Sequence, residues 1–159
     1  MALKTMLAGL VLTAAVAAGA ALAQETPPAP ATPGGKAVLV RQAHYKELNG
    51  AFRVVNEQLK AEAPDKVALA TAAGKMKALA ADLPGWFPKG SGPEAGVKTA
   101  AKAEIWTDAE GFAAAATKLQ AETAKLADAA TAGDLEALKA QARATGGACK
   151  NCHDKYRGA

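Results

Sequence analysis

The sequence predicts an all-α protein, built as an antiparallel four-helix bundle. Three observations carry this prediction. Alanine is the commonest residue, apolar residues recur at steps of three and four, and β-branched residues never gather into alternating runs. Aromatic residues make up only 4% of the chain, so we expect helices that pack closely through small and aliphatic side chains.

An export signal is predicted over residues 1–23. Lys4 precedes a continuous apolar run, and Ala21-Leu22-Ala23 is the small-x-small pattern after which a signal peptidase cuts. A membrane anchor is the alternative, but the run is only marginally long enough to span and no basic stop-transfer cluster follows it. We expect a periplasmic mature protein that begins at Gln24, with no membrane attachment after cleavage.

A flexible linker is predicted over residues 24–36, because a stretch rich in Pro, Thr, Ala and Gly cannot bury apolar area. A single domain follows over residues 37–159. The net charge is +4, and it falls to +3 when Lys4 leaves with the signal. Basic residues are scattered among Asp and Glu, so we expect no nucleic-acid binding.

The first two helices are predicted on either side of Pro64. Pro64 and Asp65 suit the first turn of the second helix, where proline loses no hydrogen bond and an acid meets the positive end of the helix dipole. Pro84 ends that helix. The inner stripe of the first helix is Arg41, Tyr45, Leu48, Phe52, Val55 and Leu59, and that of the second is Leu69, Ala72, Met76, Leu79 and Leu83.

A long crossover loop with a hydrophobic anchor, Trp86-Phe87, leads to the third helix. Thr107 and Glu110 form a predicted capping box at the start of this helix. Gly133 is placed to stop it in a left-handed turn, and Asp134 then caps the fourth helix. The inner stripes are Phe112, Ala116, Leu119, Thr123, Leu126 and Ala130 in the third helix, and Leu138, Ala142, Thr145, Cys149, Cys152 and Tyr156 in the fourth.

The only two cysteines lie in the fourth helix, in the run Cys149-Lys150-Asn151-Cys152-His153. This is the C-x-x-C-H pattern of covalent c-type haem attachment. Residues i and i+3 of a helix share a face, so both thiols can reach the vinyl edges of one porphyrin. His153 follows directly and is the candidate axial ligand of the haem iron.

Three alternatives to haem explain this run less well. A thioredoxin-like disulfide belongs at a helix N-terminus in a βαβ setting, whereas these cysteines are in the last turns of an all-α chain. A zinc site needs further ligands, and His44 is the only other histidine. Purely structural buried thiols leave the adjacent histidine without a reason. Covalent haem therefore explains this run best.

These residues resemble the cytochrome c′ family and its low-spin relatives of the cytochrome c-556 type. The resemblance covers residues 38–159 and is specific, because the attachment site is C-terminal. It is carried by Arg41-Gln42-Ala43, Glu104-Ile105-Trp106, Asp134-Leu135 and the run from Cys149 to Arg157. It implies one covalently attached haem c per chain near the C-terminus of a four-helix bundle.

The resemblance also implies roles on the two sides of the iron. The residue four after Arg41 faces the distal side in the family, and here it is Tyr45, where a methionine would give a six-coordinate iron. The family counterpart of Arg157 lies beside the proximal histidine, and Arg41 is placed to pair with a haem propionate. For both arginines, a solvated helix end is the alternative.

Other side chains are weaker candidates for the haem pocket. Met76 is ordinarily core packing and His44 ordinarily a partly exposed surface residue, although each was considered as a sixth ligand. Tyr45 is expected as a neutral phenol, because its ordinary pKa is about 10. Trp86 and Phe87 are expected to wall the haem or the end of the bundle.

The expected function is a non-enzymatic haem protein with five-coordinate, high-spin iron that binds NO and CO and could transfer electrons to a periplasmic partner of unknown identity. A six-coordinate electron carrier of the c-556 type is the alternative. A peroxidase needs a distal acid/base pair, for which Tyr45 is poorly suited. Many family members form homodimers through the first two helices, which small residues such as Ala51, Ala70 and Ala73 would permit.

Overall fold

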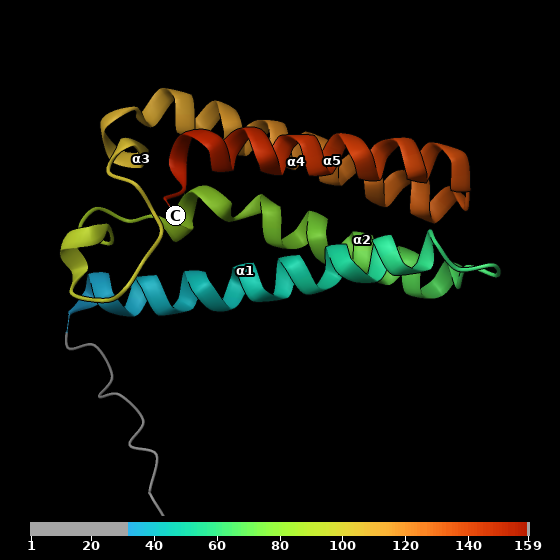
Figure 1. The fold of residues 1–159 in the computed structure, drawn as a ribbon, viewed down its shortest axis with the longest axis horizontal. Coiled ribbons are helices and arrows are strands. Elements are labelled where there is room, and N and C mark those ends of the chain that lie inside the picture. The colour runs from blue at the N-terminus through green and yellow to red at the C-terminus, as the bar shows by residue number, and fades with distance from the viewer. Residues whose placement is uncertain (1–31, 159) are drawn as a thin grey trace, which may run out of the picture.

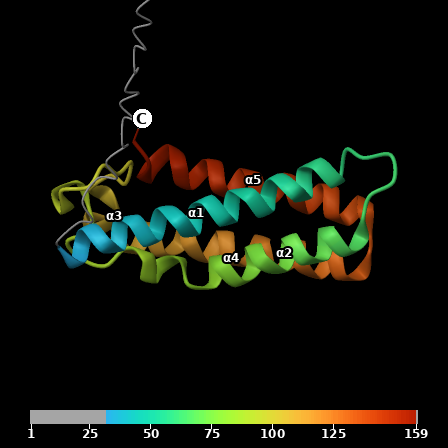
Figure 2. The same ribbon diagram turned by 90° about the horizontal axis from the view of Figure 1, so that it is seen from below.

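The computed structural model describes residues 32–158. The predicted signal over residues 1–23 and residues 24–31 of the predicted linker lie outside the described residues. Four long helices form the described part, namely α1 (Pro33–Gln58), α2 (Lys66–Ala81), α4 (Ala109–Ala132) and α5 (Leu135–Tyr156). They lie side by side in Figures 1 and 2, which confirms the predicted four-helix bundle.

The packing order leaves one side of the bundle less closed than the others. α1 packs on α2, α2 on α4, and α4 on α5 along their lengths, whereas α1 and α5 do not pack on each other in this way. The core contains fully buried aliphatic side chains from all four helices, among them Val55, Leu69, Leu126 and Leu138. Among residues 32–158, no helix has the length and apolar character needed to cross a bilayer.

Most predicted inner positions are buried. All six of the third-helix stripe are buried, as are Leu138, Ala142, Thr145 and Tyr156 in α5, while Cys149 and Cys152 are half-buried. Ala51 and Ala73 are also inside the bundle, at 7% and 0% exposure. The expectation that they would form a dimer face is therefore wrong, because small residues here let neighbouring helices of the same bundle approach.

The first helix starts earlier than predicted. Residues 33–36 belong to α1 instead of the linker, because the Thr32 side chain accepts a hydrogen bond from the Gly35 amide and proline occupies the first turn. A Cβ at Gly34 would overlap the backbone at Gly90, so the first turn packs against the crossover loop. This contact supplies the burial that the composition alone did not reveal.

Two further helix starts differ by one residue from the prediction. Asp65 is the N-cap of α2, outside its first turn, and accepts from the amides of Val67 and Ala68. Asp108, not Thr107, caps α4 by accepting from the Gly111 amide. Thr107 instead belongs to the one-turn helix α3 (Glu104–Thr107), where its hydroxyl donates to the Ala103 carbonyl.

The crossover between α2 and α4 is more ordered than a plain loop. It holds two 3₁₀ turns, Leu83–Trp86 and Pro93–Ala95, besides α3.

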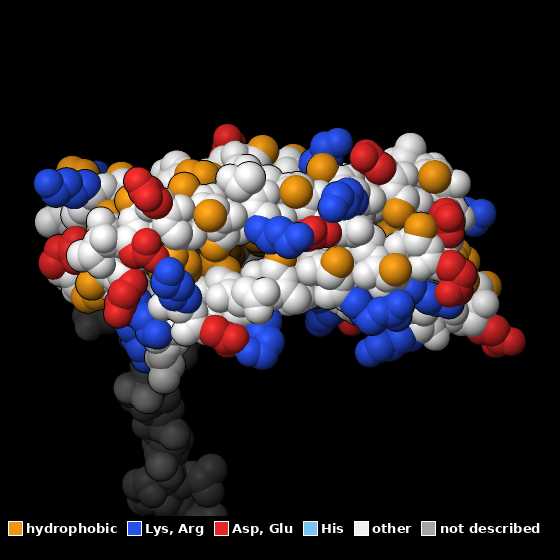
Figure 3. All heavy atoms as spheres, turned by 90° about the horizontal axis from the view of Figure 1, so that it is seen from above, with side chains coloured by type: hydrophobic (Ala, Val, Ile, Leu, Met, Phe, Trp, Pro, Cys, Tyr) orange, Lys and Arg blue, Asp and Glu red, His pale blue; other side chains and the backbone are white. Residues whose placement is uncertain are grey.

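The predicted stop at the end of α4 is confirmed, since Gly133 has a φ of 69° and Asp134 accepts from the amides of Glu136 and Ala137. On the surface seen in Figure 3, Lys and Arg alternate with Asp and Glu, without a stripe of one sign.

Candidate haem-binding site

The predicted attachment residues lie in the last two turns of α5. Cys149 and Cys152 are half-buried free thiols that pack against the core, and Cys152 also lines a cavity. Burial raises the pKa of both thiols, so both are protonated and uncharged. His153 follows on the same turn and lines the cavity as well.

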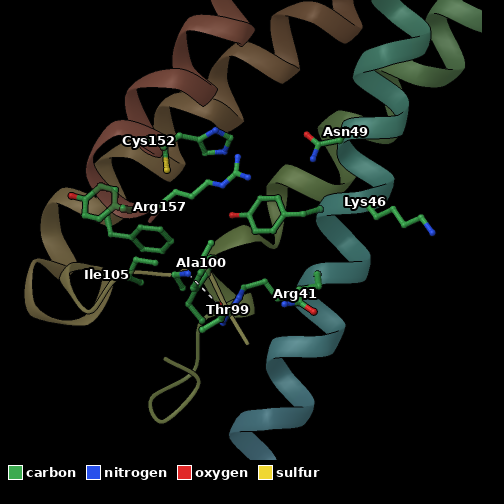
Figure 4. A pocket seen from close by; sticks show the side chains of 15 residues that line it. Arg41, Lys46, Asn49, Thr99, Ala100, Ile105, Cys152 and Arg157 are labelled. Carbon is green, nitrogen blue, oxygen red and sulfur yellow. Dashed lines mark hydrogen bonds between the residues drawn. The ribbon is translucent and has the colours of Figure 1, made fainter. Parts of the chain in front are cut away.

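This cavity has a volume of about 380 Å³ and lies between α1 and α5, on the less closed side of the bundle. Figure 4 shows Asn49 of α1 pointing across it toward Cys152 and Arg157, whereas Lys46 extends away from them. Its size is within the range of ligand pockets. Its lining comes from α1 (Arg41, Gln42, Tyr45, Lys46, Asn49), the crossover (Phe87, Thr99, Ala100, Ala101, Ile105), α4 (Phe112) and the chain end (Cys152, His153, Tyr156, Arg157).

Tyr45 faces the cysteine-bearing helix across the cavity. Burial first, and the nearby Cys152 second, raise the pKa of Tyr45 above its ordinary value. The phenol therefore stays neutral at all physiological pH values. Its ring packs edge-on against Trp86 at 5.2 Å between centroids, which fixes it from behind.

Arg41 is buried at 3% exposure and holds the crossover loop against α1. Nη1 donates to the Trp86 carbonyl at 3.2 Å and to Ser91 Oγ at 3.0 Å, and Nη2 donates to the Ser91 carbonyl at 2.9 Å and to Thr99 Oγ1 at 3.1 Å. These bonds use all four terminal N–H groups, so only Nε–H is left for a propionate. Burial lowers the pKa of Arg41.

His153 is suited to bind a metal as neutral imidazole. Partial burial first, and the charge of Arg157 second, lower the pKa of His153. Arg157 lines the same cavity, one turn further along, as the family resemblance implied. Its backbone pairs with Ala101, and the Gly158 amide donates to the Ala100 carbonyl at 2.7 Å.

The two predicted aromatic wall residues have different places. Phe87 lines the cavity, and the Arg41 guanidinium stacks 4.4 Å from its ring centroid. Trp86 does not line the cavity; it packs in a second row behind Tyr45, where it also contacts the ring of His44 at 4.7 Å. Trp86 is the last residue of the 3₁₀ turn Leu83–Trp86, whereas Phe87 is the C-cap outside the turn, with a different backbone conformation.

Neither alternative sixth ligand reaches the cavity. Met76 is 1% exposed within the core of α2, and His44 packs against Trp86 outside the cavity lining. Among residues 32–158, no three His, Cys, Asp or Glu side chains converge as metal ligands. The zinc alternative therefore gains no support from the described part of the chain.

The residues that line the cavity fit a haem. Aromatic and aliphatic side chains suit the faces of a flat macrocycle, and a thiol and an imidazole lie on one helix turn. Three cations among the lining residues, Arg41, Lys46 and Arg157, would offset the negative charge of the propionates. No carboxylate is among the lining residues of the described chain. The buried Arg41 in particular lacks an anionic partner there.

Sequence reasoning missed part of this site. Thr99, Ala100 and Ala101 come from the crossover and carry no motif, so only the folded path of the loop reveals them. Ile105 belongs to the run Glu104-Ile105-Trp106 that carries the family resemblance, but that run did not mark it as a lining residue. Asn49 could have been found, because it lies four residues after Tyr45 on the same face of α1, whereas Lys46 directly follows Tyr45 and has no such spacing.

Comparisons with known proteins agree with this geometry. The family model described as cytochrome C′ matches residues 36–157. A cytochrome c′ of Rubrivivax gelatinosus is 36% identical over 123 residues, which cover 77% of this chain and 95% of the relative.

Two solved structures superpose closely. A nitric oxide complex of a mutant cytochrome c prime from Alcaligenes xylosoxidans has a TM-score of 0.71 at 31% identity and covers 79% of this chain and 97% of that one. A cytochrome c′ with ligand-controlled dimer dissociation has a TM-score of 0.75 at 27% identity, with 80% and 98% covered.

Proposed function

This chain belongs to the cytochrome c′ family, whose members carry covalently attached haem c, and from that premise we propose that it is a periplasmic haem protein that binds NO and CO at five-coordinate iron. The relative from Alcaligenes xylosoxidans with bound nitric oxide supports the choice of ligand. The chain's own residues support the coordination number.

We assign the attachment to Cys149 and Cys152. The two thiols would hold the porphyrin as thioethers, each formed by addition of S–H across one vinyl group, so that no atom would be lost. His153 would hold the iron through a ring nitrogen, since its lowered pKa favours the neutral imidazole. Arg41, Lys46 and Arg157 supply positive charge toward the propionates.

One observation carries the five-coordinate assignment. Across the cavity from His153 stands Tyr45, a neutral phenol, and the described lining holds neither a methionine nor a second histidine. Ferrous haem iron with one free axial position binds NO and CO. Tyr45 restricts that position to small uncharged ligands by its bulk, and its hydroxyl is a donor for the bound ligand.

The same residue argues for a binding protein over a peroxidase. Splitting an O–O bond requires a distal group that accepts and returns a proton. Tyr45 has its pKa raised by burial and cannot serve as a base near neutral pH.

The optical spectrum of the ferrous holoprotein with and without CO tests the proposal. We expect a high-spin ferrous spectrum that CO converts to a low-spin form. A ferrous protein that is already low-spin and does not respond to CO would instead be a six-coordinate electron carrier.

A Tyr45→Met variant sharpens this test. A thioether at that position can reach the iron, so we expect a low-spin ferrous spectrum and a much weaker response to CO. Tyr45→Phe is the matched control, since it keeps the ring without supplying a ligand, and it should remain high-spin. If both variants keep the wild-type spectrum, residue 45 does not face the iron.

We place the mature protein in the periplasm, with cleavage after Ala23. N-terminal sequencing of the protein purified from the periplasmic fraction should begin at Gln24.

We also propose a homodimer, supported by the relative whose dimer dissociates under ligand control. Sedimentation equilibrium with and without CO tests this, and a monomer at all protein concentrations would contradict it.

A further inference from the structure

Tyr156 and Asp108 join the end of α5 to the start of α4 beside the cavity. The Tyr156 hydroxyl donates to Asp108 Oδ2 at 2.7 Å, across 48 positions of sequence. Tyr156 is 4% exposed, and its ring packs edge-on against Phe112 at 5.3 Å between centroids. The bond thus ties together two helix ends that are distant in the chain.

Asp108 serves three donors at once. Oδ1 accepts from the Gly111 amide at 3.2 Å and so caps α4, while Oδ2 accepts from Tyr156 and pairs with Lys155 Nζ at 2.5 Å. A Cβ at Gly111 would overlap both Asp108 Oδ2 and the Tyr156 hydroxyl, so glycine leaves the room in which they meet. The arrangement therefore depends on the residue types at Asp108, Gly111 and Tyr156.

The tied segment is the helix turn that carries His153. The last turn of a helix lacks intrahelical partners for its carbonyls and normally frays. Here Tyr156 lies three residues after His153, within the same turn. The Lys102 amide also donates to the Tyr156 carbonyl at 3.0 Å, so both the backbone and the side chain of Tyr156 are held.

We propose that the Tyr156–Asp108 hydrogen bond is a positioning device for His153, which keeps the last turn of α5 closed and the imidazole in one orientation toward the haem iron. The inference deepens the proposed function and rests on His153 being the axial ligand. Groups beyond the ligand commonly set its orientation and basicity. Loosening the turn lets the imidazole tilt and weakens its bond to the metal.

Resonance Raman spectroscopy of the ferrous holoprotein tests this through the iron–histidine stretching band. Tyr156→Phe removes only the hydroxyl, and Asp108→Ala removes its acceptor. We expect each to shift the band to lower frequency, broaden it and raise the midpoint potential. Asp108→Asn keeps an acceptor oxygen and a good N-cap residue, so its band should stay near that of the wild type.

The double variant Tyr156→Phe with Asp108→Ala should shift the band no further than the larger single change, because both remove one interaction. Lys139→Gln is the control, since it breaks the exposed Lys139–Glu136 pair near the other end of α5 without touching Tyr156 or the attachment residues, and it should leave the band unchanged.

Thermal unfolding, measured in parallel, separates positioning from mere stability. The inference is overturned if the single variants lose stability with an unchanged band, if their shifts add, or if Asp108→Asn shifts as far as Asp108→Ala. Should Asp108→Ala fail to fold, Tyr156→Phe alone decides. Failure of the proposed function would appear separately, in the CO spectrum of the unaltered protein.

Discussion

Arg41 connects the crossover loop to α1 through one buried side chain. Its four hydrogen bonds reach Trp86, Ser91 and Thr99, and the loop between them contributes Phe87 and Thr99 to the cavity. Bonds from a charged donor are stronger than neutral ones, and a buried acceptor left without a donor is costly. The wall of the cavity that the crossover loop forms therefore depends on Arg41, which the sequence connects to the haem site only through the family resemblance.

Replacing Arg41 by alanine should lower the free energy of unfolding by about 3 kcal/mol, because several buried acceptors lose a charged donor at once. Equilibrium unfolding of the holoprotein in urea measures the change. Arg53→Ala is the matched control on the same helix. Its side chain is 76% exposed and pairs only with Glu57, so the loss should stay within about 0.5 kcal/mol. Equal losses for the two variants would contradict this role of Arg41.

Capping residues determine where the four long helices begin and end. Gly133 ends α4 with a φ of 69°, a conformation that costs an L-residue side chain roughly 1–2 kcal/mol. A Cβ at this position would meet only the flexible tip of Lys66, at 3.4 Å. A side chain at position 133 would therefore be strained mainly by the left-handed backbone conformation and much less by a steric clash.

Gly133→Ala should therefore destabilise the protein by about 1 kcal/mol. Gly147 provides the opposite case, since it is helical in α5, exposed, and has open space where a Cβ would lie. Gly147→Ala should stabilise the protein by about 0.5 kcal/mol, because glycine loses more backbone freedom on folding. Chemical unfolding of both variants checks the pair, and the prediction fails if the two changes have the same sign.

At the scale of the whole molecule, α4 and α5 are joined by a buried carboxylate. The Glu122 side chain is 5% exposed and accepts a hydrogen bond from the Gln141 side chain on α5. Lys118 Nζ pairs with it at 2.7 Å. Lys118 first, and Gln141 second, lower the pKa of Glu122 to about 2.

This shift predicts acid destabilisation of the bundle. A carboxyl group whose pKa is lower in the folded state stabilises the fold above its unfolded value, near 4.5, and loses that contribution as the pH falls toward about 2. The melting temperature should decline across this window. Glu122→Gln keeps a polar group but cannot titrate, so its melting temperature should decline less steeply. An identical decline in both proteins would show that Glu122 is not responsible.

Sequence patterns within a few residues predicted more of the structure than could be predicted about contacts between distant residues. The inner stripes, the Gly133 stop and the Asp134 cap follow from spacing and side-chain chemistry within a few residues, and the structure confirms them. The cap at residue 108 was missed by one position, because α3 uses Thr107 in its own turn. The prediction placed Trp86 at the haem or at the end of the bundle, whereas it packs behind Tyr45, since the direction of a loop residue depends on contacts far along the chain.

The helical class, the four helices and the C-x-x-C-H attachment site follow from the amino-acid sequence alone, because periodicity and attachment chemistry act between near neighbours. The folded chain was needed to show that Arg41 donates its terminal N–H groups to the crossover loop and that Tyr156 donates to Asp108. It was also needed to show that the cavity opens between α1 and α5. These contacts join residues dozens of positions apart, and their partners exist only once the whole chain has closed around one core.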